Sequence, residues 1–146
     1  MLKKDPPIIT QQTFNQSIIL VWNAITNCNL MQQWFFESMP SFEAKVGFKT
    51  QFNVSSNTRD FLHLWTVVEV IPLKKITCNW KYQNIEGDSN VTFELNETKL
   101  GTNLTVICEI LEDFPENISE FKTESCIAGW NYFINERLKN FLSKTS

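Results

Sequence analysis

The sequence predicts an α+β fold, in which a curved antiparallel sheet of six or seven strands wraps around one long C-terminal helix. From residue 46 to residue 111, apolar and polar residues alternate with a period of two, which is typical of antiparallel strands with one buried face. After Pro115 the apolar residues recur at helical spacing instead. Strands gathered in one part of a chain and followed by a helix are typical of the α+β class. A length of 146 residues fits a single domain covering residues 1–146.

The first forty residues predict one strand and two short helices. Residues 8–14 begin with β-branched side chains, which favour a strand. Residues 15–17 supply candidates for the N-cap of a helix over 18–25, whose apolar residues recur at helical spacing. A second short helix is expected over 30–35, after a break at residues 27–29.

The alternating middle of the chain predicts a meander of hairpins. Short segments rich in Asn, Gly, Pro and Lys separate the alternating runs, and one such turn is expected at Asn57-Thr58. Connections this short favour strands that pair with their neighbours in the sequence. The clearest alternation lies in residues 48–54, 76–82, 91–95 and 104–110.

The segment 61–71 is also predicted to be a strand, although both of its faces are apolar. One face carries His63 and Trp65, and the other carries Leu62 and Leu64. A strand that is covered on both faces, or one that lines a cavity, has this composition. Alternation therefore does not decide which face points inward.

The C-terminal segment predicts a helix of about 24 residues, which spans roughly 35 Å at 1.5 Å per residue. A helix of that length crosses the whole sheet. Charged residues such as Glu124 and Glu136 fall outside its apolar stripe. The stripe predicted to be buried consists of Ile127, Trp130, Ile134, Leu138, Phe141 and Leu142, with Phe133 beside it.

Composition and charge exclude several kinds of partner and location. A net charge of −3 and scattered basic residues give no electrostatic reason to expect a nucleic-acid partner. No apolar run approaches the ~20 residues of a membrane span, and the N-terminus lacks the apolar core of a secretory signal. We therefore expect a cytoplasmic protein, in which Cys28, Cys78, Cys108 and Cys126 are free thiols.

The predicted architecture leaves room for a pocket. A helix with its side chains is about 10–12 Å across, so one helix does not fill a trough built by six or seven curved strands. Aromatic residues make up 13% of the chain, and because each large ring buries some 150–250 Å², the rings are also able to fill the trough outright. Both outcomes stay open at this point. The candidate ligand-binding residues are Trp34, Phe35, Phe52, His63, Trp65, Trp80, Trp130 and Phe133.

His63 is the only histidine, and histidine is the side chain whose ordinary pKa lies near neutrality. It is a candidate general base or polar anchor for a ligand, but a solvent-facing position is the favoured interpretation, because a base needs an orienting partner. Glu69 lies on the same face by alternation, yet about 20 Å away along the strand. We predict no catalytic residues, no metal site and no cofactor, since one histidine and dispersed cysteines form no ligand cluster and no Gly-rich phosphate loop is present.

Several motifs, taken in order, resemble those of a known family. Residues 21–26 (VWNAIT), followed by Leu30 and Trp34-Phe35, are similar to its pattern V-W-x-A-[LI]-T, then L, then W-F. Residues 67–72 (VVEVIP) resemble its V-x-E-V-x-P turn. Further similar segments are 76–80 (ITCNW), 91–95 (VTFEL), 101–105 (GTNLT) and 129–133 (GWNYF).

On these segments, which span most of residues 8–143, the chain is similar to the family related to activators of the heat-shock protein 90 ATPase. That family belongs to the helix-grip (SRPBCC) superfamily, with START lipid-transfer domains, birch-pollen-allergen-like proteins and polyketide cyclases, so the resemblance implies a helix-grip fold. Where the family usually has a Gly after the second helix, this chain has Phe35-Phe36-Glu37, which implies a changed cavity mouth. Eukaryotic activators carry an additional N-terminal domain that binds the chaperone, and no segment of this sequence corresponds to it.

We therefore expect a binding domain for a small hydrophobic molecule, held between the sheet and the C-terminal helix. One alternative is an enzyme resembling cyclases or dehydratases, with His63 as its acid or base. The other is a protein-interaction module resembling chaperone activators, which would use the outer face of the sheet or the short helices. The sequence does not indicate an oligomeric state.

Overall fold

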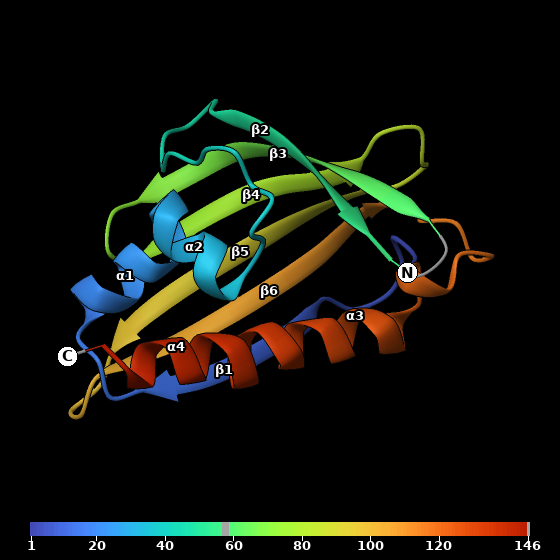
Figure 1. The fold of residues 1–146 in the computed structure, drawn as a ribbon. Helices are drawn as coiled ribbons and strands as arrows, with labels where there is room; N and C mark the ends of the chain where they lie inside the picture. Colours follow the sequence, from blue (N-terminus) through green and yellow to red (C-terminus); the bar gives the residue numbers. More distant parts are fainter. Residues whose placement is uncertain (57–58, 146) are drawn as a thin grey trace.

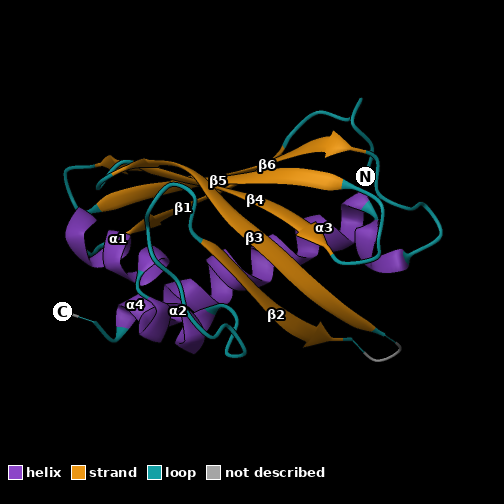
Figure 2. Ribbon diagram, turned by 90° about the horizontal axis from the view of Figure 1, so that it is seen from above, coloured by secondary structure: helices purple, strands orange, loops and turns teal. Residues whose placement is uncertain are grey.

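A six-stranded antiparallel sheet forms one layer of the protein (Figures 1 and 2). The computed structural model describes residues 1–56 and 59–145, and the turn predicted at Asn57-Thr58 lies outside them. The strand order is β1-β6-β5-β4-β3-β2, so β2 to β6 form a meander and β1 pairs with β6. The predicted α+β class and helix-grip arrangement are confirmed. The strands are β1 (Ile8–Phe14), β2 (Lys49–Ser55), β3 (Asp60–Ile71), β4 (Lys75–Tyr82), β5 (Asp88–Glu97) and β6 (Thr102–Glu112).

Two short helices follow β1, as the sequence predicts, and they cover one end of the sheet (Figure 1). In α1 (Ile18–Thr26) the side chain of Ser17 caps the N-terminus by accepting a hydrogen bond from the backbone nitrogen of Leu20. The next helix, α2 (Cys28–Trp34), begins two residues before the predicted start. The reason is Asn27, which follows α1 directly and whose side chain caps α2.

The C-terminal helix runs continuously from residue 123 to residue 143 across the same face of the sheet (Figure 2). It consists of α3 (Thr123–Trp130), a π-helical segment η2 (Asn131–Leu138) and α4 (Lys139–Ser143). Its buried residues are Trp130, Ile134, Leu138 and Leu142.

One residue of the predicted helical stripe was assigned wrongly. Ile127 is 43% exposed, whereas the buried residues recur at a step of four from Trp130 onward. The prediction assumed ordinary α-helical spacing, and a π-helical segment has wider turns that change which residues share a face.

A β-bulge changes which residues of β3 point inward. Val67 pairs with Cys78 and Glu69 pairs with Thr77, which leaves Val68 as the extra residue. Before the bulge the odd-numbered residues are buried; after it Glu69 is exposed, and its carboxylate lies 2.9 Å from the amino group of Lys75. The prediction that Glu69 shares the face of His63 is therefore wrong.

Two further observations limit what the fold does. Among the described residues, no helix is long and apolar enough to cross a membrane. The same residues contain no group of three or more His, Cys, Asp or Glu side chains placed to hold a metal ion.

Candidate functional site

Aromatic rings fill the half of the trough that lies next to α1 and α2. The Trp34 and Phe35 rings stack in parallel, with centroids 4.6 Å apart, and Trp34 Nε1 donates a hydrogen bond to the carbonyl oxygen of Ala24. The Phe35 ring then contacts Trp65 on β3 and Trp130 on the long helix. We call the cluster of Trp34, Phe35, Phe52, Trp65 and Phe93 the aromatic plug. Its members are buried, and their rings join the sheet to the long helix.

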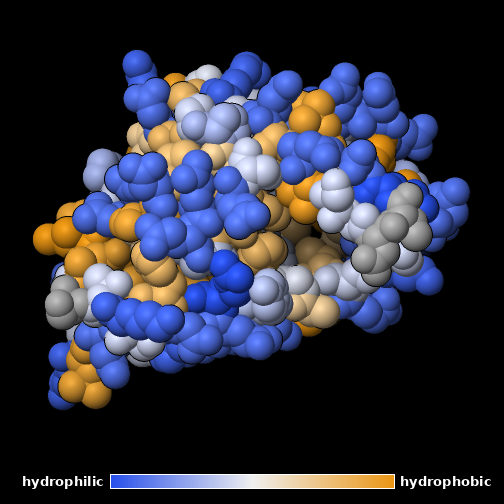
Figure 3. Space-filling model, in the orientation of Figure 1, coloured by the Kyte–Doolittle hydropathy of each residue, from blue (hydrophilic) through white to orange (hydrophobic). Residues whose placement is uncertain are grey.

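The other half of the trough contains a cavity of about 300 Å³. It lies between α3 and the ends of β3, β4, β5 and β6, and its lining is mainly aromatic and aliphatic. Figure 3 shows a hollow above the long helix with apolar atoms inside it. The sheet and helix thus enclose both a filled and an open compartment.

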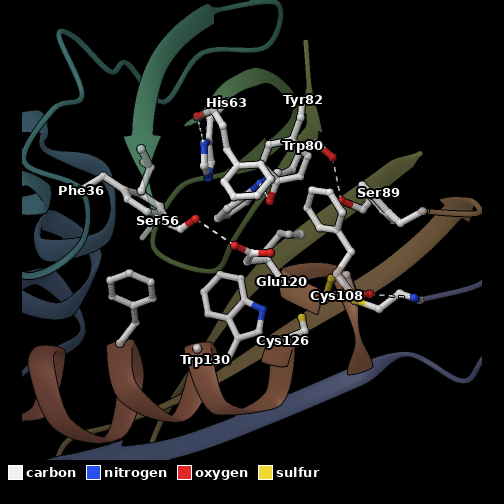
Figure 4. A pocket seen from close by; sticks show the side chains of 18 of the residues that line it. Phe36, Ser56, His63, Trp80, Tyr82, Ser89, Cys108, Glu120, Cys126 and Trp130 are labelled. Atoms are coloured by element: carbon white, nitrogen blue, oxygen red, sulfur yellow. Dashed lines mark hydrogen bonds between the residues drawn. The ribbon is translucent and has the colours of Figure 1, made fainter. Parts of the chain in front are cut away.

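Four of the predicted ligand-binding residues line this cavity: His63, Trp80, Trp130 and Phe133. They come from β3, β4 and the long helix, and Figure 4 shows the labelled members around the open space. The other four, Trp34, Phe35, Phe52 and Trp65, are buried in the aromatic plug and are not part of the cavity lining.

Of the Phe35-Phe36-Glu37 segment, the two phenylalanines lie inside the trough, whereas Glu37 is exposed. Phe35 belongs to the plug, and Phe36 lines the cavity with its ring 5.2 Å from that of His63. These two rings divide the filled compartment from the open one.

Several lining residues were absent from the predicted set. Tyr82 and Cys108 lie on strand faces that alternation already assigned to the interior, so the sequence contained a signal for them. Phe114, Glu120 and Phe121 come from the connection between β6 and α3, which contains the short 3-10 helix η1 (Ser119–Phe121). That segment has no periodicity, so only the structure places it.

This connection closes one end of the cavity. Phe114 and Phe121 pack with Phe61 in a small aromatic cluster. Gly87, whose φ is +119°, lies against the Phe114 ring, and a Cβ at this position would come within 2.4 Å of a ring carbon. A glycine is therefore required there for two reasons, its positive φ and the close approach of the ring.

His63 is buried, and the solvent-facing interpretation is wrong. Its imidazole stacks on the Phe52 ring, with centroids 5.1 Å apart, and meets the Tyr82 ring edge-on at 4.7 Å. The Nδ1 atom lies 3.0 Å from the carbonyl oxygen of Phe61. Burial disfavours the charged ring and lowers the pKa of His63 to about 4, so the imidazole is neutral at physiological pH.

Two further polar groups occupy the cavity wall. Trp80 Nε1 donates a hydrogen bond of 2.9 Å to Tyr82 Oη, and burial raises the pKa of that phenol, which stays protonated. The hydroxyl of Ser56 donates to the Glu120 carboxylate at 2.8 Å, and this hydrogen bond lowers the pKa of Glu120 (Figure 4).

Two cysteines also line the cavity, Cys108 on β6 and Cys126 on α3 (Figure 4). The interaction between the two thiols, together with burial, raises the pKa of Cys108, and the same interaction lowers that of Cys126. The four cysteines are free thiols.

This arrangement is suited to hold an apolar molecule and to orient it through a few polar groups. Neutral His63 and Tyr82 offer hydrogen bonds inside the cavity, and Glu120 carries a charge that its serine partner stabilises. The described part of the chain brings no carboxylate into hydrogen-bonding contact with the imidazole.

Solved structures of other proteins share this fold. A protein of Chromobacterium violaceum superposes with a TM-score of 0.77 at 17% identity, covering 92% of this chain and 94% of that one. A protein of Mesorhizobium loti gives 0.76 at 21%, with coverages of 97% and 99%. CalU16 of Micromonospora echinospora gives 0.68 at 23%, with coverages of 94% and 76%. At these identities the likeness concerns the fold alone.

The sequence comparisons identify the family. None of the curated protein sequences matches the chain. The model of the family described as "Activator of Hsp90 ATPase homolog 1-like protein" matches residues 15–143, which is most of the chain, in agreement with the motifs noted in the sequence. The chain therefore belongs to the family of Activator of Hsp90 ATPase homolog 1-like proteins.

Proposed function

We propose that this protein binds a small hydrophobic molecule in the cavity beside α3. The observation that carries the proposal is an apolar cavity of about 300 Å³ in a trough whose other half is packed with rings. Ligand pockets commonly have volumes of ~300–1,000 Å³, with mainly apolar walls and a few polar groups that orient the ligand. His63 and Tyr82 are polar groups of this kind.

The geometry favours binding over acid–base catalysis. A general base works best when its pKa lies near the operating pH. Burial lowers the pKa of His63 to about 4, and the hydrogen bond of its Nδ1 goes to a backbone carbonyl instead of a carboxylate. A docking role on the outer surface has less support, because the most exposed large apolar side chains, Leu100, Val46 and Ile9, lie on three separate segments.

Gly129 offers a way to fill the cavity without disturbing the sheet. It lies on α3 in the cavity lining, and apart from its chain neighbours and the backbone of its own helix no atom lies within 4 Å of the position that its Cβ would take. Gly129→Leu therefore places an isobutyl group in the open space, and it also replaces a helical glycine with a good helix former. We predict that this variant is at least as stable as the wild type and loses binding of small hydrophobic molecules.

Binding is measured by titrating the protein with 1-naphthol and monitoring tryptophan fluorescence. Two of the tryptophans, Trp80 and Trp130, line the cavity. Native mass spectrometry of freshly purified protein tests for a co-purifying ligand. Ala128→Leu adds a similar side chain at an exposed position of the same helix and is expected to bind like the wild type. Gly129→Leu protein that binds as tightly as the wild type would contradict the proposal.

A further inference from the structure

His63 is held in a single tautomer by its own strand. Its Nδ1 lies 3.0 Å from the carbonyl oxygen of Phe61. A carbonyl oxygen accepts hydrogen bonds and does not donate them, so Nδ1 of the neutral ring carries the proton. Nε2 is then an acceptor with a free lone pair.

This lone pair faces the cavity without a partner. No described residue donates a hydrogen bond to Nε2, and Figure 4 shows the second ring nitrogen directed toward the open space. The rings of Phe36, Phe52 and Tyr82 surround the imidazole and have no donor in contact with Nε2. An occupant that displaces water from the cavity leaves Nε2 without a hydrogen bond unless it donates one itself, so a donor gains affinity that a purely apolar occupant does not.

Tyr82 supplies a donor beside this acceptor. His63 and Tyr82 are partners across β3 and β4, with their ring centroids 4.7 Å apart. Tyr82 Oη already accepts a hydrogen bond from Trp80 Nε1, so its own proton is available for another acceptor. A hydroxyl group on a ligand both donates and accepts. It can therefore donate its proton to Nε2 of His63 and accept the proton of the Tyr82 hydroxyl.

The charges around the cavity disfavour an anion. Within the described residues, no lysine or arginine side chain lines it, and its one charged side chain is the carboxylate of Glu120. The amino group of Met1, which also borders the cavity, donates to the carbonyl oxygen of Phe121 at 2.8 Å. A bound carboxylate would lose its hydration and lie near the Glu120 carboxylate, and the ammonium of Met1 already donates to a carbonyl oxygen.

We infer that the cavity selects uncharged apolar molecules that carry a hydroxyl group, an alcohol or a phenol, which donates its proton to Nε2 of His63. The inference rests on the proposed function and narrows it to one class of ligand. It also predicts that carboxylates of the same shape are rejected.

Three bicyclic molecules of similar shape test the inference: 1-naphthol, 1-methoxynaphthalene and 1-naphthoate. By calorimetric titration at pH 7.5, we expect 1-naphthol to bind about tenfold more tightly than the methyl ether, which has no proton to donate. We expect 1-naphthoate to bind at least about 100-fold more weakly than 1-naphthol. Because burial lowers the pKa of His63 to about 4, the order of affinities should stay the same from pH 8 to pH 5.5.

His63→Phe removes the acceptor and keeps an aromatic ring. The variant is expected to bind the methyl ether like the wild type and to lose the tenfold preference for 1-naphthol. If the variant does not fold, the ¹⁵N resonance of Nε2 in the wild type decides instead, because accepting a hydrogen bond shifts it.

The outcomes separate this inference from the proposed function. Equal wild-type affinities for 1-naphthol and its methyl ether, or an Nε2 resonance that does not move on binding, overturn the inference and leave the proposed function in place. Failure of all three molecules to bind overturns the proposed function.

Discussion

A buried neutral histidine couples the stability of a protein to pH. His63 is 6% exposed, and burial lowers its pKa from 6.5 to about 4. Between these two values the unfolded chain binds a proton that the folded protein does not bind. The contribution of His63 to stability is therefore complete above about pH 6.5, and it is lost progressively as the pH falls toward 4.

We predict that lowering the pH from 8 to 5 reduces the free energy of unfolding by about 2 kcal/mol through His63 alone. Urea unfolding at pH 8, 6.5 and 5 measures this change. The range ends above the ordinary pKa values of carboxyl groups, so their protonation adds little. His63→Phe should be nearly insensitive over the same range, and equal slopes for variant and wild type would show that the ring is not buried in its neutral form.

His63 also marks what sequence reasoning could and could not decide for a single residue. As the only histidine it was an evident candidate. Its burial depended on which face of β3 points inward, and Leu62 and Leu64 make the opposite face apolar as well, while the bulge at Val68 changes the alternation farther along the strand. Its neutral state depends on the surrounding rings, which come from β2, β4 and the segment after α2.

At the scale of an element, the C-terminal helix shows how spacing selects a helix type. Its buried residues Trp130, Ile134, Leu138 and Leu142 follow at a constant step of four. On a regular α-helix with 3.6 residues per turn, such a step drifts around the axis. The wider turns of η2 compensate for the drift and keep the row against the sheet. The step of four is visible in the sequence. Ile127, however, lies three residues before Trp130, and α-helical spacing also places such a residue in the buried stripe.

This helix predicts a clear contrast between two isoleucines. Ile127→Glu should change the free energy of unfolding by less than about 0.5 kcal/mol, because the side chain is exposed. Ile134→Ala should cost about 2–5 kcal/mol, because Ile134 is fully buried and its truncation leaves a void. Urea unfolding of both variants measures the contrast, and a cost above about 1 kcal/mol for Ile127→Glu would place it in the buried stripe after all.

At the scale of the whole molecule, local sequence patterns predict the order and type of the helices and strands. They do not predict how the trough is divided between the aromatic plug and the cavity. Alternation and helical spacing act over a few residues, and they predicted the sheet and the helices that surround it. The boundary between plug and cavity depends on where the Phe35 and Phe36 rings lie. The opposite end of the cavity depends on the segment 113–122, which closes it. These placements are tertiary contacts without a periodic signal.

The same division predicts that two phenylalanines in contact have different roles. The Phe35 ring is 6% exposed and is enclosed by rings from α2, the sheet and the long helix, so Phe35→Ala should cost about 3–5 kcal/mol. The neighbouring Phe133 ring, with its centroid 4.9 Å from that of Phe35, is only partly buried and borders the cavity. Its truncation removes less buried surface, so Phe133→Ala should cost about 1–2 kcal/mol.

Phe133→Ala should also enlarge the cavity, and the variant should therefore bind 9-phenanthrol, which has one ring more than 1-naphthol, more tightly than the wild type does. Urea unfolding compares the stabilities, and titration with both phenols compares the cavities. If Phe133→Ala destabilised the protein as strongly as Phe35→Ala and gained no affinity for the larger phenol, the Phe133 ring would belong to the packed core. The cavity would then be smaller than the structure indicates. The packed core would extend from Phe35 across to Phe133 without a break, between the sheet and the long helix.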